Sequence, residues 1–411
     1  MHLLYKIFLF FLIIISPFLF IIRIIIEKED PKRFIEKFCF FSNKSLKGKT
    51  VWIHGASLGE IQSIIPIVKN FEKNNKIKQI LITSNTLSSS FLIPKFKFKK
   101  TVHQFFPIDL YYFSKKFLNY WNPSVAIFVD SEIWPNMISN LYKKKIPIII
   151  LNARFTKKSF NRWIAFPKFS KNIFKKISMA IPQNSETLYY LKTLGVKNIK
   201  KISNLKYYGE KFQSKFNPSL KNKFSKRNIW CAASTHEGEE VLIANVHKKV
   251  KTNNKKLLTI LIPRHVDRKD SIVRNLKNND LKVVTHSSGN KIKSNTDVYL
   301  VDTYGEALKF YNLTKLVFMG GSLIPHGGQN PLEPARLGNL IIHGPYVNNF
   351  KEVYNFLKDL KLSIKIYRPL QIEKILIKKI KNSQKNTKTK KLNLIGKKIL
   401  ANNIIELNKY I

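Results

Sequence analysis

The chain has 411 residues, with 73 Lys and Arg against 25 Asp and Glu, and a formal net charge of +48. Its length allows two domains with a hydrophobic core in each. The charge favours nucleic acid, an anionic membrane surface or anionic substrates as partners, although a general bias toward Lys, Asn and Ile explains it equally well. There is no RNA-binding signature and no zinc-finger spacing, which argues against nucleic acid. Cys39 and Cys231 lack CxxC spacing, so they indicate neither a disulfide nor a zinc site and fit a reducing compartment.

Residues 1–28 are predicted to form a membrane anchor. The apolar run from Ile7 to Ile22 is interrupted only by Ser16 and Pro17, and its extension through Ile26 reaches the length of a spanning helix. No small-residue cleavage site follows, which favours an uncleaved anchor over a signal peptide. More basic residues follow the run than precede it, so we expect the rest of the chain on the cytoplasmic side. A half-inserted helix stays open as an alternative, because Pro17 and Arg23 weaken a straight span.

Residues 29–210 predict an α/β domain with a parallel sheet. Continuous apolar segments alternate with amphipathic ones, which is typical of parallel strands buried on both faces. The stretch 91–100, with alternating apolar and basic residues, predicts either a half-buried strand or a loop on an anionic membrane surface. Ligands of such sheets bind outside the carboxyl ends of the strands, so the residues after each strand are the candidates for chemistry. The predicted strands are 51–54, 79–83, 101–105, 125–129, 146–152 and 177–182.

Two glutamates of this domain follow predicted strands, each beside the beginning of a helix. Glu60 comes after the first strand and Glu132 after the fourth, and the basic residues Arg154 and Lys206 follow later strands. Two carboxylates with Arg and Lys suit general-base chemistry beside an anionic donor. From spacing alone, the alternative stays open that these acids only stabilise helix dipoles and that the basic residues are surface charges.

Residues 211–228 are polar and lysine-rich and predict a linker, followed by a second α/β domain over 229–390 and a C-terminal helix over 391–411. The loop after the second strand of this domain contains Arg264, His265 and Arg268, which fits phosphate or carboxylate recognition. The predicted strands are 229–233, 257–263, 298–301, 316–319 and 340–343.

The loop that begins at Gly320 has the features of an anion site. Two Gly-Gly pairs precede Asn330, a predicted helix N-cap, and Pro331, which suits the first helical position. A strand, a glycine loop and a helix N-terminus in this order present backbone N–H groups to an anion, usually a phosphate. Glu333, in the first turn, is placed to accept hydrogen bonds from a ribose diol. The alternative is an ordinary βαβ connection whose glycines only make turns.

Two Rossmann-like α/β domains whose loops face a shared cleft describe the GT-B architecture of glycosyltransferases. The nucleotide would bind to the C-terminal domain. The sequence shows neither a DxD-like motif nor the ligand spacing of a calcium or zinc site, so we predict no metal and no cofactor.

Eight motifs resemble those of the 3-deoxy-D-manno-octulosonic acid (Kdo) transferases of Gram-negative lipopolysaccharide assembly. They occur in the family's order and cover nearly the whole chain from about residue 30. The predicted N-terminal anchor also resembles that of the family. The motifs are WIHGASLGE at 52–60, SEIWPN at 131–136, LNAR at 151–154, NLKY at 204–207, ASTHEGEE at 233–240, PRHVDR at 263–268, VDTYGEALKFY at 301–311 and GGSLIPHGGQNPLEPA at 320–335.

The resemblance implies an inverting transfer of Kdo from CMP-Kdo to the lipid A precursor (lipid IVA) at the cytoplasmic face of the inner membrane. Glu60 would be the general base, and Glu132 and Lys206 would stabilise the transition state. The partners would be CMP-Kdo, the lipid A precursor and inner-membrane lipids, without nucleic acid. Gln329 departs from the family, which more often has His there. CMP would be held by Pro263, Arg264, Tyr304, Gly305, Glu306, Asn330, Pro331, Leu332 and Glu333.

Two other functions stay open beside this one. A GT-B enzyme that uses another nucleotide sugar would also need an acid for the ribose, so Glu333 does not discriminate. A non-catalytic, membrane-associated protein whose loops only bind anions is the other alternative, and the carboxylates after the predicted strands argue against it.

Overall fold

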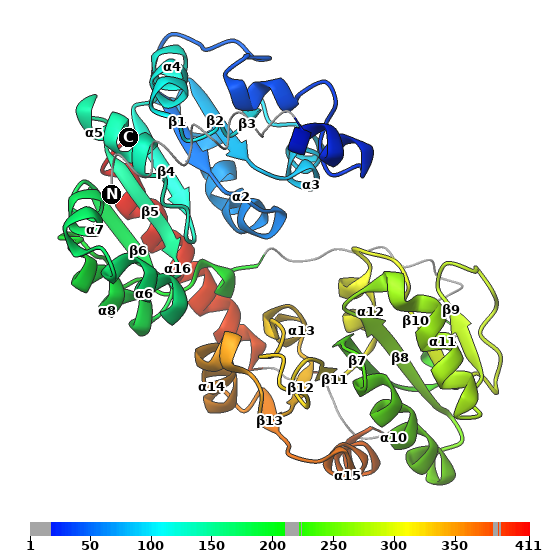
Figure 1. The fold of residues 1–411 in the computed structure, drawn as a ribbon. Coiled ribbons are helices and arrows are strands. Elements are labelled where there is room, and N and C mark those ends of the chain that lie inside the picture. Colours follow the sequence, from blue (N-terminus) through cyan, green and yellow to red (C-terminus); the bar gives the residue numbers. More distant parts are fainter. Residues whose placement is uncertain (1–17, 210–221, 223, 381–384, 386–387) are drawn as a thin grey trace. The chain divides into compact units, whose positions relative to one another are not determined.

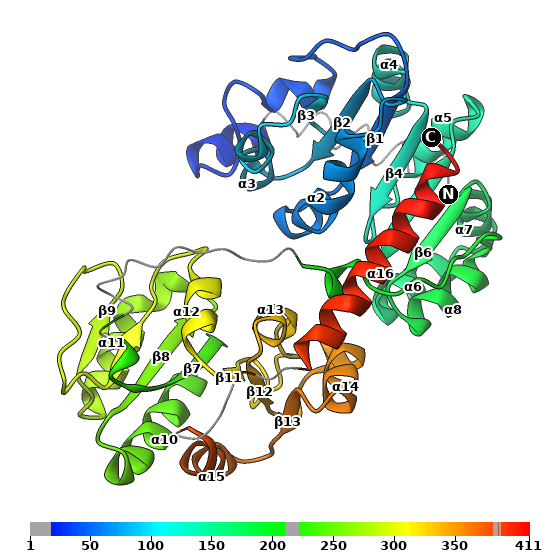
Figure 2. The ribbon, with the colours of Figure 1, turned by 180° about the vertical axis from the view of Figure 1, so that it is seen from behind.

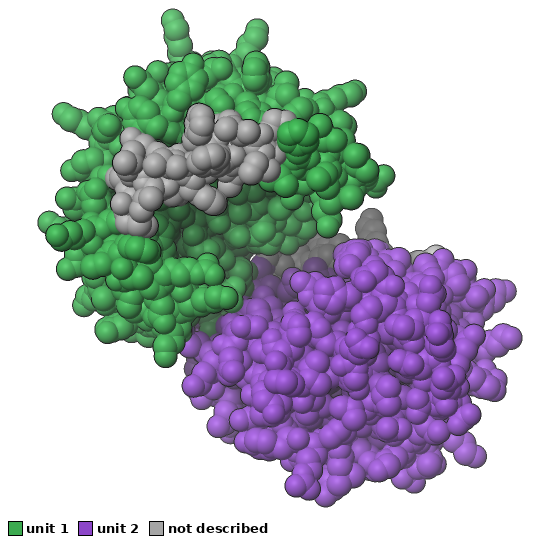
Figure 3. Space-filling model, viewed as in Figure 1, with its two compact units in different colours: residues 1–208, 396–411 green, residues 209–395 purple. Residues whose placement is uncertain are grey.

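The computed structural model describes residues 18–209, 222, 224–380, 385 and 388–411. The chain divides into two compact units, shown in different colours in Figure 3. Unit 1 comprises residues 1–208 and 396–411, and unit 2 comprises residues 209–395. The predicted linker, residues 211–228, lies largely outside the described residues.

Unit 1 contains a six-stranded, fully parallel sheet in the order β3-β2-β1-β4-β5-β6 (Figure 1). All six strands predicted for this domain are present, with ends displaced by at most two residues. The order is that of dinucleotide-binding folds and reverses between β1 and β4, which makes the carboxyl ends of these two strands the expected ligand position. The strands are β1 (Thr50–His54), β2 (Gln79–Ser84), β3 (Thr101–Phe105), β4 (Val125–Val129), β5 (Ile148–Ala153) and β6 (Met179–Pro182).

The strands of unit 1 are buried on both faces. On β1, Trp52 enters one hydrophobic cluster, whereas Val51 and Ile53 enter another. Successive side chains of a strand point to opposite faces, so a strand between two cores is apolar at every position and shows no alternation in the sequence. The helices of the unit are α2 (Leu58–Glu72), α3 (Leu87–Ser90), α4 (Tyr111–Trp121), α5 (Pro135–Lys143), α6 (Lys157–Ile164), α7 (Pro167–Phe174) and α8 (Ser185–Leu194).

The C-terminal helix α16 (Thr389–Asn408) returns to unit 1 with residues 396–411. Figure 2 shows it crossing one face of the sheet. Leu407 is part of the same cluster as Val51, and Leu400 and Ile404 pack against that cluster. The last segment of the chain therefore completes the core of the first unit.

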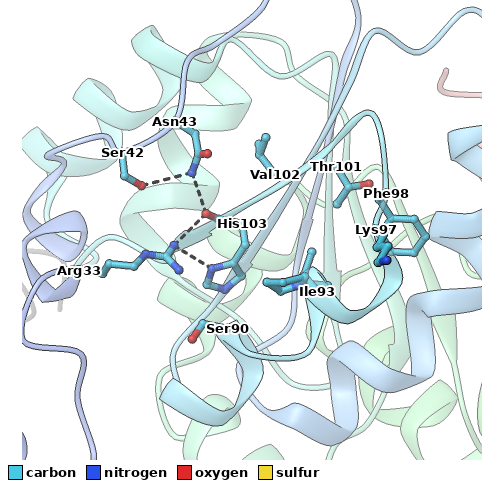
Figure 4. A pocket seen from close by; sticks show the side chains of 11 residues that line it. Arg33, Ser42, Asn43, Ser90, Ile93, Lys97, Phe98, Thr101, Val102 and His103 are labelled. Carbon is cyan, nitrogen blue, oxygen red and sulfur yellow. Dashed lines mark hydrogen bonds between the residues drawn. The ribbon is translucent and has the colours of Figure 1, made fainter.

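The free edge of the sheet at β3 is covered by side chains from residues 33–43. Arg33 Nη2 and Asn43 Nδ2 donate to the carbonyl oxygen of His103 at 2.9 and 3.0 Å (Figure 4). Glu36, in the 3₁₀ turn η1 (Phe34–Phe38), accepts a 2.8 Å hydrogen bond from the backbone N–H of Phe105. These bonds occupy backbone groups that would otherwise invite pairing with another strand. A cavity of about 500 Å³ beside this edge is lined by residues that include Arg33, Asn43, Lys97 and His103.

The stretch 91–100 does not form a strand, so that alternative was wrong. It forms the 3₁₀ turn η2 (Ile93–Phe96), which ends at Lys97 in the left-handed region with φ 49°. The rings of Phe96 and Phe98 stack with centroids 5.4 Å apart and pack against the core of unit 1. The alternation of apolar and basic residues therefore reflects a turn with its aromatic side chains packed inward. The membrane-surface alternative stays a prediction.

Residues 1–17 of the predicted anchor lie outside the described residues. Residues 18–25 are helical, with Phe18, Ile21 and Ile25 exposed by 70%, 55% and 73%. Among the helices of the described ranges, none is both long enough and apolar enough to cross a bilayer. The anchor therefore stays a prediction.

Unit 2 contains a seven-stranded parallel sheet in the order β13-β12-β11-β7-β8-β10-β9. Here the order reverses between β7 and β11, which places the loops after these two strands at the ligand position. The strands are β7 (Asn228–Thr235), β8 (Leu257–Pro263), β9 (Val283–Thr285), β10 (Val298–Leu300), β11 (Leu316–Met319), β12 (Leu340–His343) and β13 (Ser363–Lys365). The helices are α10 (Glu239–Asn253), α11 (Lys269–Asn278), α12 (Ala307–Leu313), α13 (Leu332–Arg336), α14 (Lys351–Asp359) and α15 (Pro369–Lys379).

Candidate active site

Glu60 is held at the beginning of α2, after β1. The side chain of Ser57 caps the helix by accepting from the Glu60 N–H. The Glu60 carboxylate in turn accepts from the Ser57 hydroxyl at 2.8 Å and from the Ala56 N–H at 2.7 Å. This is a capping arrangement, as the structural alternative predicted. It also fixes the carboxylate next to the point where the strand order reverses.

The environment of Glu60 also suits a base. Burial raises its pKa to about 7, and the nearby charges of Asp130 and Glu132 act in the same direction, against the hydrogen bonds from Ser57 and Ala56. The structure therefore brings Glu60 and Glu132 together, as predicted. A carboxyl group that titrates near neutral pH is suited to accept a proton at physiological pH.

Glu132 follows β4 and is contacted by two side chains. Trp134 Nε1 donates to Glu132 Oε2 at 2.9 Å, and His54 Nε2 lies 3.2 Å from the same oxygen. Both of these contacts are made to Oε2 and leave the other carboxylate oxygen, Oε1, to other partners. The Glu132 side chain is 15% exposed, so it is fixed but still accessible.

Lys206 forms an ion pair with Asp130, a residue close to Glu132 in the sequence that we had not predicted for the site. The Lys206 ammonium is 3.6 Å from Asp130 Oδ2, and Asn152 donates to Asp130 Oδ1 at 2.8 Å. Asp130 and Asn152 both adopt left-handed backbone conformations, with φ 57° and 52°, at the ends of β4 and β5. Such conformations are uncommon outside glycine and cluster at functional sites. The only sequence signal for Asp130 was its position directly after a buried strand.

Replacing Asp130 with Asn is expected to shift the pH dependence of any reaction in which Glu60 acts as the base. Asn tolerates a left-handed backbone and still accepts from Asn152, so the fold is kept. The lost negative charge lowers the pKa of Glu60, and the acidic limb of the pH–rate profile moves to lower pH. Asp280→Asn, at an acid of unit 2 that is 87% exposed, is the control and leaves the profile unchanged. An unshifted profile for the Asp130 variant contradicts the coupling.

In unit 2 the first glycine loop is already occupied by a carboxylate of the protein. Glu239, at the beginning of α10, accepts from the backbone N–H groups of Gly321 (2.7 Å), Ser322 and Leu323 (both 3.2 Å) and His236 (3.1 Å). Its side chain is fully buried. The N–H groups of Gly321, Ser322 and Leu323 therefore bind an anion of the chain itself. An external phosphate at the second Gly-Gly pair and Asn330 stays a prediction.

The glycine at 320 is required by a close backbone approach. A Cβ atom at Gly320 would lie 2.4 Å from the carbonyl oxygen of Ser234 and 2.6 Å from the Cα of Thr235. Gly320 thus lets the end of β11 pack directly against the end of β7, which positions the two loops that meet at the switch point.

The residues predicted to bind the ribose and phosphate lie beyond this loop, around α13. Glu333 is exposed in its first turn, whereas Leu332 is buried. Helix α13 is only five residues long, and Pro331, predicted inside the helix, is its N-cap. Asn330, predicted as the N-cap, lies one residue before this position, and its side-chain oxygen accepts from the N–H of Leu332, the first residue of the helix, at 3.1 Å. A one-turn helix has a small dipole, so phosphate binding here must depend on side chains as well.

The basic residues predicted after β8 fall into two groups, one engaged in an ion pair with a buried acid and one exposed. Arg268 forms a two-point ion pair with buried Glu240, at 3.1 and 3.3 Å, and is structural. Arg264 and His265 are exposed, and Pro263 ends the strand.

Two histidines that we had not assigned to the site lie at the same end of the unit 2 sheet. The rings of His236 and His326 have centroids 3.8 Å apart. Burial and the neighbouring His326, His265, Arg264 and Arg268 lower the pKa of His236 to about 4. Gln329, the residue predicted to depart from the resembled family, has its side-chain nitrogen 3.1 Å from His236 Nε2. A neutral His236 accepts this bond, so Gln329 does not disrupt the cluster.

The predicted residues Tyr304, Gly305 and Glu306 form the loop before α12. Tyr304 is 68% exposed, Gly305 has φ 83°, and Glu306 pairs with Lys309. They follow β10, at the same end of the sheet as Arg264. In the part of the chain that the structure describes, no group of three or more His, Cys, Asp or Glu residues could hold a metal ion.

Two parallel-sheet α/β units, each with candidate polar residues at the carboxyl ends of its strands, resemble the architecture of GT-B glycosyltransferases. The crystal structure of UDP-GlcNAc 2-epimerase from Neisseria meningitidis has a similar fold, with a TM-score of 0.56 over 87% of this chain and all of that chain, at 10% identity. At that identity the similarity concerns the fold alone.

Sequence comparison gives the family. The profile described as 3-Deoxy-D-manno-octulosonic-acid transferase (kdotransferase) matches residues 32–208. The 3-deoxy-D-manno-octulosonic acid transferase of Rickettsia bellii is 34% identical over 87% of this chain and 86% of its own length. The protein of the same name from Haemophilus influenzae is 29% identical, over 85% and 84%. The chain belongs to the Kdo transferase family, and the predicted resemblance is confirmed.

Proposed function

We propose that the protein transfers Kdo from CMP-Kdo to a lipid A precursor, lipid IVA, with Glu60 as the general base. Membership of the Kdo transferase family supports the transferred sugar. The observation that carries the mechanism is the half-buried Glu60, whose pKa is raised to about 7 beside two further carboxylates.

In this reaction Glu60 accepts the proton of the acceptor hydroxyl. A lone pair of the deprotonated hydroxyl oxygen attacks the anomeric carbon of Kdo, and the bond from that carbon to the phosphate oxygen breaks. CMP leaves with the bonding electrons, so one displacement inverts the anomeric centre. Glu132 faces the positive charge that develops on the sugar ring, and Lys206 offsets negative charge on the donor.

Unit 2 supplies the residues for CMP. In this proposal Arg264 binds the phosphate and Glu333 accepts from the ribose hydroxyls, which is supported by their exposure at the carboxyl ends of the unit 2 strands. The leaving group is a nucleoside monophosphate, whose charge basic side chains can balance.

Arg264→Gln is expected to weaken CMP binding roughly 10-fold, because a charge-assisted hydrogen bond to phosphate is lost. Isothermal titration calorimetry with CMP measures this loss. Arg274→Gln, at an exposed arginine on α11 of the same unit, is the matched control and keeps the affinity. If the two variants bind CMP with equal affinity, Arg264 does not belong to the CMP site.

Localisation at the cytoplasmic face of the inner membrane belongs to the same proposal. A lipid acceptor requires access to the bilayer, and the exposed apolar side chains of residues 18–25 support such contact.

The test of the function is a transfer assay with CMP-Kdo and tetra-acylated lipid A precursor, followed by mass spectrometry of the lipid. A gain of one or more Kdo units is expected. An unchanged lipid, with UDP displacing labelled CMP from the protein, would favour another nucleotide sugar. CMP binding without any transfer would favour a non-catalytic protein.

A further inference from the structure

A chain of buried side chains ends on Glu132. Trp52 Nε1 donates to the Thr83 hydroxyl oxygen at 2.9 Å. That oxygen is 2.9 Å from Nδ1 of His54, whose Nε2 lies 3.2 Å from Glu132 Oε2. The side chains of Trp52, Thr83 and His54 are fully buried, and only Glu132 is accessible.

His54 Nδ1 has two neighbours on Thr83, the hydroxyl oxygen at 2.9 Å and the carbonyl oxygen at 3.2 Å. The Thr83 hydroxyl oxygen accepts from Trp52, so its single proton is free to point to Nδ1. Nε2 faces a carboxylate oxygen, which donates nothing when ionised, so the contact with Glu132 is a hydrogen bond only when Nε2 carries a proton. We assign the direction of donation on this ground as Trp52 to Thr83, Thr83 to His54, and His54 to Glu132.

We propose that His54 is a positioning residue for Kdo transfer, which holds Glu132 through its Nε2–H while Thr83 fixes the ring. This inference rests on the proposed function. The sheet makes the arrangement rigid, because His54 and Thr83 pair in register on neighbouring strands β1 and β2. The His54 ring is further held by Phe106, with centroids 4.0 Å apart. Glu132 sits on a loop, so without His54 only Trp134 would fix its carboxylate.

Unit 2 contains the same set of side chains away from its candidate site, which provides an internal control. Trp230 Nε1 donates to Thr259 Oγ1 at 2.8 Å, His247 Nδ1 lies 2.8 Å from that oxygen, and His247 Nε2 lies 3.2 Å from Asp297. Asp297 directly precedes β10, so it lies at the amino ends of the strands, opposite the CMP residues. His247 is as buried as His54. Its role is structural.

The test compares His54→Phe and His54→Gln with His247→Phe in the full chain. Phe places an aromatic ring in the same space but cannot donate, so His54→Phe is expected to lower kcat roughly 30-fold, because Trp134 alone then holds Glu132. KM for CMP-Kdo stays within about twofold, because the donor-binding residues are untouched. In His54→Gln the amide N–H replaces Nε2–H and restores most of kcat. His247→Phe lowers Tm, as His54→Phe also does, but keeps kcat per folded molecule.

The outcomes separate this inference from the proposed function. If the wild-type protein transfers no Kdo, both the proposed function and the positioning role of His54 are refuted. If the wild type is active and His54→Phe keeps its kcat, the positioning role alone is refuted. The same holds if the kcat of His54→Gln is no higher than that of His54→Phe. The ¹⁵N NMR signals of the His54 ring in the unliganded wild type are an independent check, since a proton found on Nδ1 alone would overturn the proposed direction of donation.

Discussion

Glu60→Gln is expected to lower kcat by about 10²–10⁴-fold, the range that a general base contributes. Gln has nearly the shape of Glu, and its carbonyl oxygen can still accept from Ala56 or Ser57, but it cannot take a proton from the acceptor hydroxyl. Steady-state kinetics of Kdo transfer measure the loss, and CMP binding, which depends on unit 2, is unchanged. The matched control is Glu186→Gln at the first-turn acid of α8, whose carboxylate accepts from Tyr190. It keeps full activity.

Loss of folding cannot explain the expected effect of Glu60→Gln. The pKa of Glu60 is higher in the folded protein, at about 7, than its ordinary value of 4.5. Between these two pH values the folded state binds more protons than the unfolded state, so this group lowers stability as pH rises from 4.5 to 7. Removing the charge removes that cost. A Glu60→Gln protein that is inactive and melts several degrees below wild type at pH 7.5 would contradict this account.

The largest expected effect on stability comes from Glu239→Gln. The carboxylate accepts four backbone N–H groups, whereas an amide oxygen accepts two and its NH₂ group faces the other donors. Two buried donors without partners cost roughly 2–4 kcal/mol, which lowers Tm by about 5–10 °C. The loop after β11 then moves, and CMP affinity falls at least 10-fold.

Differential scanning calorimetry and titration with CMP test this prediction together. Glu237→Gln, two residues earlier and exposed, is the control and changes neither quantity measurably. If Glu239→Gln melts with the wild type, the loop does not depend on the carboxylate. If it melts early but binds CMP normally, the loop is separate from the nucleotide site.

The central strands could be predicted from the sequence because burial on both faces leaves them apolar at every position. Strands β9 and β13 were missed, since each has only three residues, lies at a sheet edge and is partly exposed. The residues 91–100 were ambiguous because an inward-packed turn can show the same alternation as a half-buried strand.

The site could be predicted only as far as residues that follow strands. Position after a strand made Glu60 and Glu132 candidates, and the family resemblance supplied their proposed roles. Their partners come from distant segments, such as His54 and Asp130, and spacing does not show which side chains meet. The glycine loop shows the same limit, because its pattern indicates that an anion is bound but not that the anion is Glu239 of the chain itself.

The most direct test of the central claim is the pH dependence of kcat/KM for Kdo transfer from CMP-Kdo to lipid IVA, followed by product mass. We expect a Kdo-bearing lipid whose rate of formation rises with pH and levels off above about pH 7, as Glu60 loses its proton. Glu60→Gln should lack this rise. A wild-type rate that stays constant from pH 5 to pH 8, or an unchanged rise in the variant, would contradict the assignment of Glu60 as the base.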